Sequence, residues 1–214
     1  MKPSYLSYFI EESTPVYGGA KNTITFMPNS SIDKGDTTNS LKINIQNHIG
    51  THIDFPFHFS NNGKKCIDYP ASFWVFNKVG FLNCSIEKVP DKINQLASDI
   101  ELLILKTEFG QNRGQENYWS SQPIIPASFA TFFRTKFPNL RAFGFDLISL
   151  TSKLNREEGK RAHKAFLLEE DILVLEDMNL SELNNTPKQV LISPLQIGIA
   201  DGVPCTVISF NTLF

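Results

Sequence analysis

Three of the chain's four histidines lie between residues 48 and 58, in the segment HIGTHIDFPFHF. His48, His52 and His58 share this segment with one carboxylate, Asp54. Imidazole nitrogens and carboxylate oxygens are ligands that Zn²⁺ and Mn²⁺ accept in proteins. A lone histidine on a strand is usually a hydrogen-bonded core residue, but three beside an aspartate concentrate polar groups that need partners when buried. We therefore predict a site for a divalent metal ion here.

The spacing of these residues also restricts the backbone. The histidines and Asp54 occupy even positions, whereas most odd positions are isoleucine or phenylalanine, as on a strand with one polar face. On a straight strand, His48 and His52 would be roughly 13 Å apart, too far to share one ion. We therefore predict a turn at 49–51, permitted by Gly50, that leads into a short strand presenting His52 and Asp54. Pro56 and the β-branched residues disfavour a helix.

The elements around this segment are predicted mainly as strands. The segment 41–46 alternates apolar and polar residues, which is typical of a half-buried strand. Apolar runs predict further strands at 73–82, 101–107, 140–150, 172–176, 189–195 and 205–210, and helical spacing predicts helices at 126–137 and 155–170. The polar segments 28–40 and 110–123 are predicted as loops, the second long enough to shape a cleft. We expect an α/β fold with a mostly β core and flanking helices, in a single domain spanning 1–214.

Composition argues against several classes of protein. The formal net charge is -2 and no basic run is present, so we expect no nucleic-acid or anionic-membrane partner. No segment is apolar over the length that a membrane helix needs. The three cysteines are far apart and form no CxxC pair, which indicates a reducing compartment and no disulfide framework. We expect a soluble, cytoplasmic protein without a signal peptide.

The histidine segment resembles the signature His-x-Gly-Thr-His-x-Asp-x-Pro-x-His-Phe of the metal-dependent cyclase family, which includes bacterial kynurenine formamidases and isatin hydrolases. Every fixed position of that signature is filled between His48 and Phe59. Other segments resemble the family as well: TPVYGG at 14–19, FGFDLISL at 143–150, and HKAFLLEEDILVLEDMNL at 163–180. The resemblance extends over nearly the whole chain, and it implies a fold of the swivelling β/β/α type.

The family resemblance also implies roles for these residues. His48, His52 and Asp54 would be metal ligands, and Asp54 could bridge two ions. His163 and Glu176 would complete the metal site, although Asp177 is as plausible a ligand as Glu176 on the residues alone. His58 would be the catalytic acid/base instead of a ligand. The resemblance implies one or two Zn²⁺ or Mn²⁺ ions, no organic cofactor, and assembly into a homodimer or a higher homo-oligomer.

The implied reaction is metal-dependent hydrolysis of a small amide or formamide, with arylformamidase-like activity first. Metal-activated water would attack the carbonyl carbon, and His58 would pass a proton to the leaving amine. Phe55, Phe57, Phe59, Trp74 and Tyr17 are available to line an aromatic pocket. The alternatives are a lactone hydrolase, a cyclase or dehydratase that uses the same site, and a metal-holding binding protein without catalysis.

The chain departs from the family at two places. Thr206 stands where the family often has an arginine, and Lys106 and Glu108 stand where arginine and glycine are frequent. None of these residues is a predicted ligand. We expect the changes to affect substrate recognition or subunit contacts, which makes the hydrolase assignment firmer than the kynurenine formamidase assignment.

Overall fold

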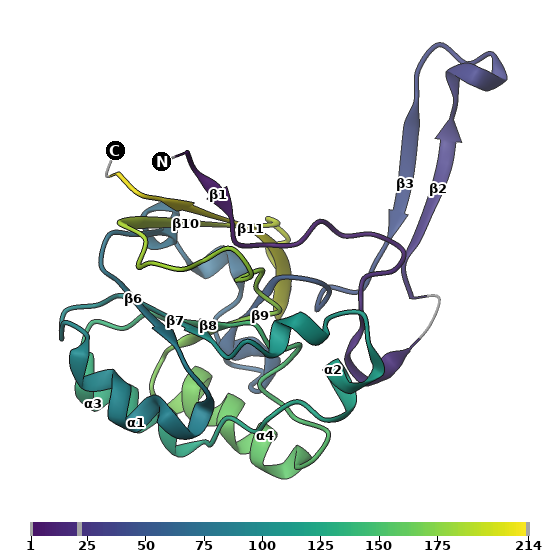
Figure 1. Ribbon diagram of the computed structural model, residues 1–214. Helices are drawn as coiled ribbons and strands as arrows, with labels where there is room; N and C mark the ends of the chain where they lie inside the picture. Colours follow the sequence, from purple (N-terminus) through teal and green to yellow (C-terminus); the bar gives the residue numbers. More distant parts are fainter. Residues whose placement is uncertain (1, 21–22, 213–214) are drawn as a thin grey trace.

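The core of the computed structural model, which describes residues 2–20 and 23–212, is one mixed β-sheet of nine strands (Figure 1). The strands of the chain are β1 (Ser4–Tyr5), β2 (Thr25–Ser30), β3 (Ser40–Asn44), β4 (His52–Asp54), β5 (Val75–Phe76), β6 (Val79–Asn83), β7 (Leu102–Lys106), β8 (Ala142–Phe145), β9 (Leu173–Glu176), β10 (Gln189–Pro194) and β11 (Gly202–Phe210). The helices are α1 (Val89–Lys92), α2 (Glu116–Ser120), α3 (Ser128–Lys136) and α4 (Arg156–Lys164), which continues into a π-helical turn, Ala165–Glu169. Only β2 and β3 stand apart, as a separate two-stranded sheet.

The strand order of the large sheet brings distant segments together. It runs β5-β10-β11-β4-β9-β8-β7-β6, and β1 adds to β11. Strands β6 to β9 are parallel, whereas the pairs that involve β4, β5, β10 and β11 are antiparallel. Strands β5 and β6 lie at opposite ends of this order although only residues 77–78 separate them in the chain, so the sheet curls back toward closure. The predicted mixed α/β fold with a mostly β core is confirmed.

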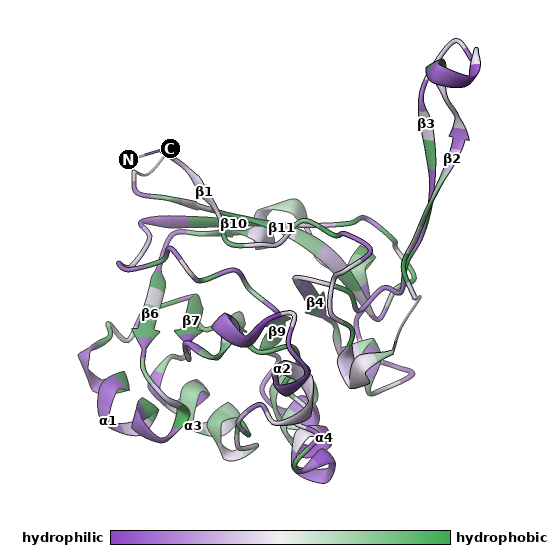
Figure 2. Cartoon of the chain, turned by 45° about the vertical axis from the view of Figure 1, so that its right-hand side comes forward, coloured by the Kyte–Doolittle hydropathy of each residue, from purple (hydrophilic) through white to green (hydrophobic). Residues whose placement is uncertain are grey.

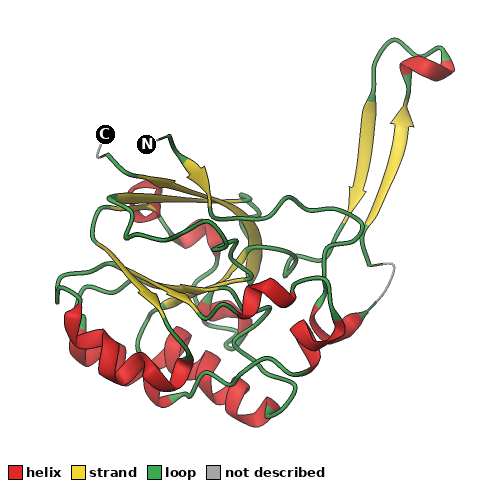
Figure 3. Cartoon of the chain, viewed as in Figure 1, coloured by secondary structure: helices red, strands yellow, loops and turns green. Residues whose placement is uncertain are grey.

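The helices cover the parallel part of the sheet. In Figures 1 and 3, α1, α3 and α4 lie along one side of strands β6 to β9. Phenylalanine rings fill this layer: Phe133 of α3 lies 5.1 Å from Phe143 of β8, which lies 5.3 Å from Phe166 of the π-helical turn, measured between ring centroids. These three rings are fully buried. The phenylalanines of α3 are therefore part of the core, except Phe132, which is 36% exposed.

Two predicted strands differ from the observed ones. The segment 41–46 does form a strand, β3, but this strand is exposed along its whole length and is not half-buried. It pairs with β2 in a hairpin that projects away from the rest of the molecule (Figure 1), so its alternating pattern has no core to face. The predicted strand 73–82 is a 3-10 turn followed by β5 and β6, because the chain turns at residues 77–78.

Other element boundaries also differ. Only 142–145 of the predicted strand 140–150 is strand. The predicted loop 110–123 contains α2, and Tyr118 of this helix is fully buried. The helices predicted at 126–137 and 155–170 are present. Within the described ranges, no helix is long and apolar enough to cross a membrane.

Candidate active site

A backbone turn delivers the first two histidines to one place. Gly50 has φ of +59°, a left-handed conformation that side-chain-bearing residues seldom adopt. The chain then enters β4, which carries His52 and Asp54. The predicted turn at 49–51 and the short strand after it are both confirmed. The alternation ends at Asp54, because a 3-10 turn, Pro56–His58, follows directly and is the one helical element in a segment predicted to have none.

The register of β4 with its neighbouring strands β9 and β11 positions further residues of the site. On one side His52 lies opposite Glu176 of β9, and on the other Asp54 lies opposite Gly202 of β11. A Cβ atom at Gly202 would lie 2.4 Å from Cε1 of His48, which is far inside contact distance. Gly202 is therefore the residue that lets the His48 ring lie against the sheet beside Asp54.

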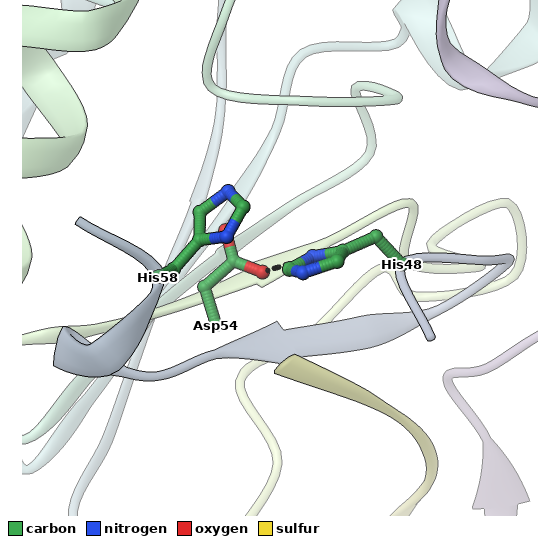
Figure 4. Close-up of side chains that lie close together, drawn as sticks. All are labelled: His48, Asp54 and His58. Atoms are coloured by element: carbon green, nitrogen blue, oxygen red, sulfur yellow. Dashed lines mark hydrogen bonds and ion pairs between the residues drawn. The ribbon is translucent and has the colours of Figure 1, made fainter. Parts of the chain in front are cut away.

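Two overlapping groups of side chains could each hold a metal ion. His52, Asp54 and Glu176 are buried and form one group, and His48, Asp54 and His58 form the other, with the ligand atoms of each group within 4.8 Å of one another. Asp54 belongs to both groups, and Figure 4 shows its carboxylate between the rings of His48 and His58.

His163 reaches the same carboxylates from α4. Its Nε2 lies 3.3 Å from Oε1 of Glu176 and 3.4 Å from Oδ2 of Asp54, and Nε2 of His52 lies 3.2 Å from Oε2 of Glu176. All of the sequence-predicted metal-site residues are thus brought together.

The second ring nitrogens of two histidines are held by the backbone. Nδ1 of His52 donates to the carbonyl of Gly50 at 2.8 Å, and Nδ1 of His163 donates to the carbonyl of Gly159 at 2.9 Å. These bonds orient each ring so that its Nε2 points toward the carboxylates. Metal-binding histidines characteristically donate their other ring N–H in this way.

The charges of the cluster also suit a cation. Burial disfavours the charged imidazole, but the carboxylates of Asp54 and Glu176 outweigh it and raise the pKa of His163 to about 10. Burial likewise opposes ionisation of Asp54, yet its hydrogen bonds to histidines hold the pKa of this carboxyl well below its usual range. Two buried carboxylates so close together need positive charge, from imidazolium protons or from a metal ion. With imidazole nitrogens and carboxylate oxygens as donors, the residues fit Zn²⁺ or Mn²⁺.

His58 lies at the outer side of the cluster and is held by an aspartate that the sequence did not single out. Nδ1 of His58 donates to Oδ2 of Asp201 at 2.7 Å, and the same oxygen lies 3.0 Å from Nε2 of His48. Burial tends to raise the pKa of Asp201, but the hydrogen bonds from His58 and His48 lower it to about 2. Asn47 also donates to Asp201. Asp201 therefore orients His58 and stays ionised.

The choice between Glu176 and Asp177 as the carboxylate that faces the histidines is clear in the structure. Asp177 has φ of +50° and turns away, where Arg113 donates to both of its carboxylate oxygens. Tyr118 of α2 donates to the same carboxylate at 2.5 Å. The segment 110–123, predicted as a loop, thus supports the site from behind, and of the two carboxylates Glu176 is the one that contacts His52 and His163.

A cavity of about 550 Å³ opens over the cluster. Of the aromatic residues predicted to line a pocket, Tyr17 and Phe59 line this one. Phe55 is fully buried and packs against Tyr69, and Trp74 lines a different cavity, so these two are not part of the site.

Sequence reasoning missed Asp201 and Gly202. They lie about 150 residues from His48 in the sequence, and a single aspartate-glycine pair ahead of a strand carries little signal. They belong to the segment DGVPCT at 201–206, in which Thr206 stands where the family often has an arginine. Thr206 is exposed and lines another cavity, away from the cluster. Glu108 has φ of +64°, which explains why a glycine suits that position.

Comparison with known proteins identifies a family and relatives whose sequences resemble this chain. Residues 5–151 match the model of the Cyclase family, described as "Putative cyclase". The chain is 30% identical over 179 residues to the kynurenine formamidase of Bacillus thuringiensis subsp. konkukian (strain 97-27), and the match covers 81% of each chain.

Two solved structures have the same fold. Isatin hydrolase A from Labrenzia aggregata bound to benzyl benzoate has a TM-score of 0.80 at 18% identity, over 99% of this chain and 94% of that one. A structure described as a potential metal-dependent hydrolase with cyclase activity has a TM-score of 0.77 at 19% identity, over 100% and 99% of the two chains.

Proposed function

The chain belongs to the Cyclase family, and from that membership we propose that it is a metal-dependent hydrolase of a small aryl formamide or related amide. One observation carries the proposal: Asp54 and Glu176, 1% and 2% exposed, face the Nε2 atoms of His52 and His163 under an open cavity. The relative named kynurenine formamidase supports hydrolysis of a non-peptide C–N bond. N-formylkynurenine is therefore the first candidate substrate, and a role in tryptophan catabolism would follow.

We propose that His48, His52, Asp54, His163 and Glu176 hold the metal, as one or two Zn²⁺ or Mn²⁺ ions. Oδ1 of Asp54 faces His48 and His52, and Oδ2 faces His163, so this carboxylate would help to hold any ion bound there. A divalent ion bound there would activate water and polarise the substrate carbonyl. Tyr17 and Phe59 would contact the aromatic part of the substrate from the walls of the cavity.

His58 is the proposed general acid/base. Its Nδ1 is committed to Asp201, whereas its Nε2 has no partner among the residues that the structure describes. Nε2 can therefore take a proton during attack and return it to the leaving amine. Asp201 holds the ring in one tautomer and stabilises its protonated form. A metal-holding protein without catalysis would not need this pair.

We also propose a homodimer, in which the β2–β3 hairpin contacts a second copy of the chain. Strand pairing places Phe26 opposite Ile43 and Pro28 opposite Leu41, on one apolar face of the hairpin. Leu41 and Ile43 are 52% and 56% exposed, and Figure 2 shows the hairpin standing clear of the other elements. Because an isolated two-stranded hairpin is marginally stable in water, burial of this face in a partner would stabilise it.

A cytoplasmic location remains part of the proposal. All three cysteines are unpaired, and Cys66 and Cys205 are buried, as expected in a reducing compartment.

A substrate panel tests the proposed reaction. Metal-stripped protein and protein reloaded with Zn²⁺ or Mn²⁺ are assayed on N-formylkynurenine, isatin and simple lactones. We expect the reloaded protein to hydrolyse N-formylkynurenine and the stripped protein to be inactive. Faster turnover of a lactone would favour the alternative reaction at the same site, and equal activity with and without metal would contradict the proposal.

A further inference from the structure

The cavity over the cluster has two chemically different ends. Its floor carries the carboxylates of Asp54 and Glu176, while its lining also includes two cationic side chains, Arg156 and Lys160. The floor provides the donor atoms for a metal ion, and the reacting carbonyl of the substrate would lie there. The cations have no part in that chemistry, so they are available to recognise a different group of the substrate.

Helix α4 places these cations relative to the cluster. Arg156 and Lys160 are four residues apart and therefore lie on the same side of the helix. His163 follows three residues later on that side and reaches the carboxylates with its Nε2. One face of α4 thus runs from Arg156, through Lys160, to the proposed metal centre.

Arg156 differs from the other arginines in having no ion-pair partner among the residues that the structure describes. Among the described residues, the guanidinium groups of the other four, Arg113, Arg134, Arg141 and Arg161, each form an ion pair. No hydrogen bond or ion pair is formed by the Arg156 side chain within the same part of the chain. Lys160 is bound only to Glu157, at 2.8 Å, and that carboxylate is 80% exposed, so a pair of this kind is weak and easily exchanged.

Tyr17 is a second side chain of the cavity that lacks a hydrogen-bond partner within the described ranges. The hydroxyl of Tyr17 is buried and forms no hydrogen bond with any residue that the structure describes. Tyr17 lines the same cavity as Arg156 and Lys160. A buried hydroxyl without a partner is unfavourable.

We propose that Arg156 and Lys160 bind a carboxylate of the substrate, and that they select aryl formamides or amides whose carboxylate lies away from the scissile carbonyl. The inference rests on the proposed function. The reacting carbonyl would occupy the floor, and Arg156 and Lys160 are the cations of the lining that take no part in holding the metal, so the substrate is oriented with its carbonyl toward the cluster and its anion toward α4. A cavity of about 550 Å³ has room for an aromatic ring with such a side chain.

Binding of a matched pair of product-like ligands tests this orientation without turnover. Calorimetry on the metal-loaded protein compares 3-(2-aminophenyl)propanoate with its neutral amide. We expect the propanoate to bind about tenfold more tightly at low salt, as two partly exposed cations would provide, and to lose this preference as salt is raised. Equal affinity for the two ligands, or no binding of the propanoate, would overturn the inference.

Variants of α4 complete the test. Arg156→Gln is expected to reduce the preference about threefold, and Arg156→Gln combined with Lys160→Gln is expected to abolish it. Lys164→Gln removes one charge from the same helix, at an exposed position that does not line the cavity, and should leave the preference unchanged. A double variant that keeps the full preference would also overturn the inference.

Hydrolysis of unsubstituted formanilide, measured on the same wild-type preparation, reports on the proposed function separately. If the propanoate is preferred but neither formanilide nor N-formylkynurenine is cleaved, the proposed reaction fails while the cationic recognition stands. If formanilide is cleaved but the two ligands bind equally, only the recognition by Arg156 and Lys160 fails.

Discussion

Asp54 is the residue on which the proposed metal centre depends most, because its two oxygens face three imidazoles. Oδ1 lies 2.9 Å from Nδ1 of His48 and 3.6 Å from Nε2 of His52, and Oδ2 lies 3.4 Å from Nε2 of His163. At 1% exposure this carboxylate has almost no contact with solvent. In the metal-free protein its charge must be balanced by protons on the histidines.

That balance predicts how the stability of the metal-free protein depends on pH. Burial opposes the charged form of His48, but Asp54 and Asp201 outweigh it and raise its pKa to about 9. The pKa of His163 is raised further, to about 10, against about 6.5 in the unfolded chain. Since the folded values are the higher ones, this stabilisation is complete below pH 6.5 and is lost as pH rises through 9 to 10.

Thermal unfolding of chelator-treated protein, followed from pH 6.5 to 10, should therefore show a falling midpoint. Protein reloaded with Zn²⁺ should show a much smaller decline in this range, because the ion replaces the protons. A midpoint that stays constant in the metal-free protein would contradict the charge balance described for the cluster.

Asp201 is predicted to act on turnover through His58. Asp201→Asn keeps a hydrogen-bond acceptor but removes the charge that stabilises protonated His58, so kcat should fall by about tenfold to hundredfold. Metal content, measured on the same sample, should change little. Asp99→Asn is the control, since Asp99 is exposed and pairs only with Lys78 at the surface. Unchanged kcat in Asp201→Asn would show that His58 does not need this partner.

At the scale of elements, strand register accounts for the site better than sequence proximity does. Strand β4 is only three residues long, yet it lies between β9 and β11 and so joins residues 52–54 to two segments from the last fifth of the chain. Asp54 opposite Gly202 and His52 opposite Glu176 are two consequences of the same register.

Gly202 tests that register directly. Gly202→Ala would place a methyl group into the His48 ring, and we expect it to lower stability by about 1–3 kcal/mol and to weaken metal binding. Gly198→Ala is the matched control, because its added Cβ would meet Ile67 only at 3.5 Å, an ordinary contact. Metal affinity and thermal midpoint are measured for both variants. Equal effects of the two substitutions would argue against close packing of His48 on β11.

The sequence predicted the backbone correctly where the proposed function itself restricts the local geometry. The distance between His48 and His52 required a bend, and Gly50 provides it. The alternation of polar residues at even positions with apolar residues at odd positions predicted the strand only as far as Asp54, because Pro56 begins a 3-10 turn. The strand at 41–46 was predicted as half-buried because alternation says which residues share a face, but not whether a core exists to cover it. The role of Asp201 could not be predicted from the sequence, because its hydrogen bond with His58 depends on β11 lying beside β4.

At the scale of the whole molecule, the β2–β3 hairpin exposes an apolar face that the rest of the described chain does not cover. Leu41→Asp together with Ile43→Asp places two charges on its apolar face. We expect wild-type protein to elute as a dimer in size-exclusion chromatography with light scattering, and this variant to be a monomer. Lys42→Asp, on the opposite face, should remain dimeric. A monomeric wild type would end the proposal of a homodimer.

The metal content of three purified proteins tests the central claim most directly. Wild type, His52→Ala and His58→Ala are dialysed, analysed for Zn²⁺ and Mn²⁺, and assayed on the same formamide. We predict that wild type retains metal, that His52→Ala loses both metal and turnover, and that His58→Ala keeps most metal while kcat falls by about 10²–10⁴. A wild type that is fully active without metal would contradict the account. Loss of metal in His58→Ala as complete as in His52→Ala would make His58 a ligand instead of the acid/base.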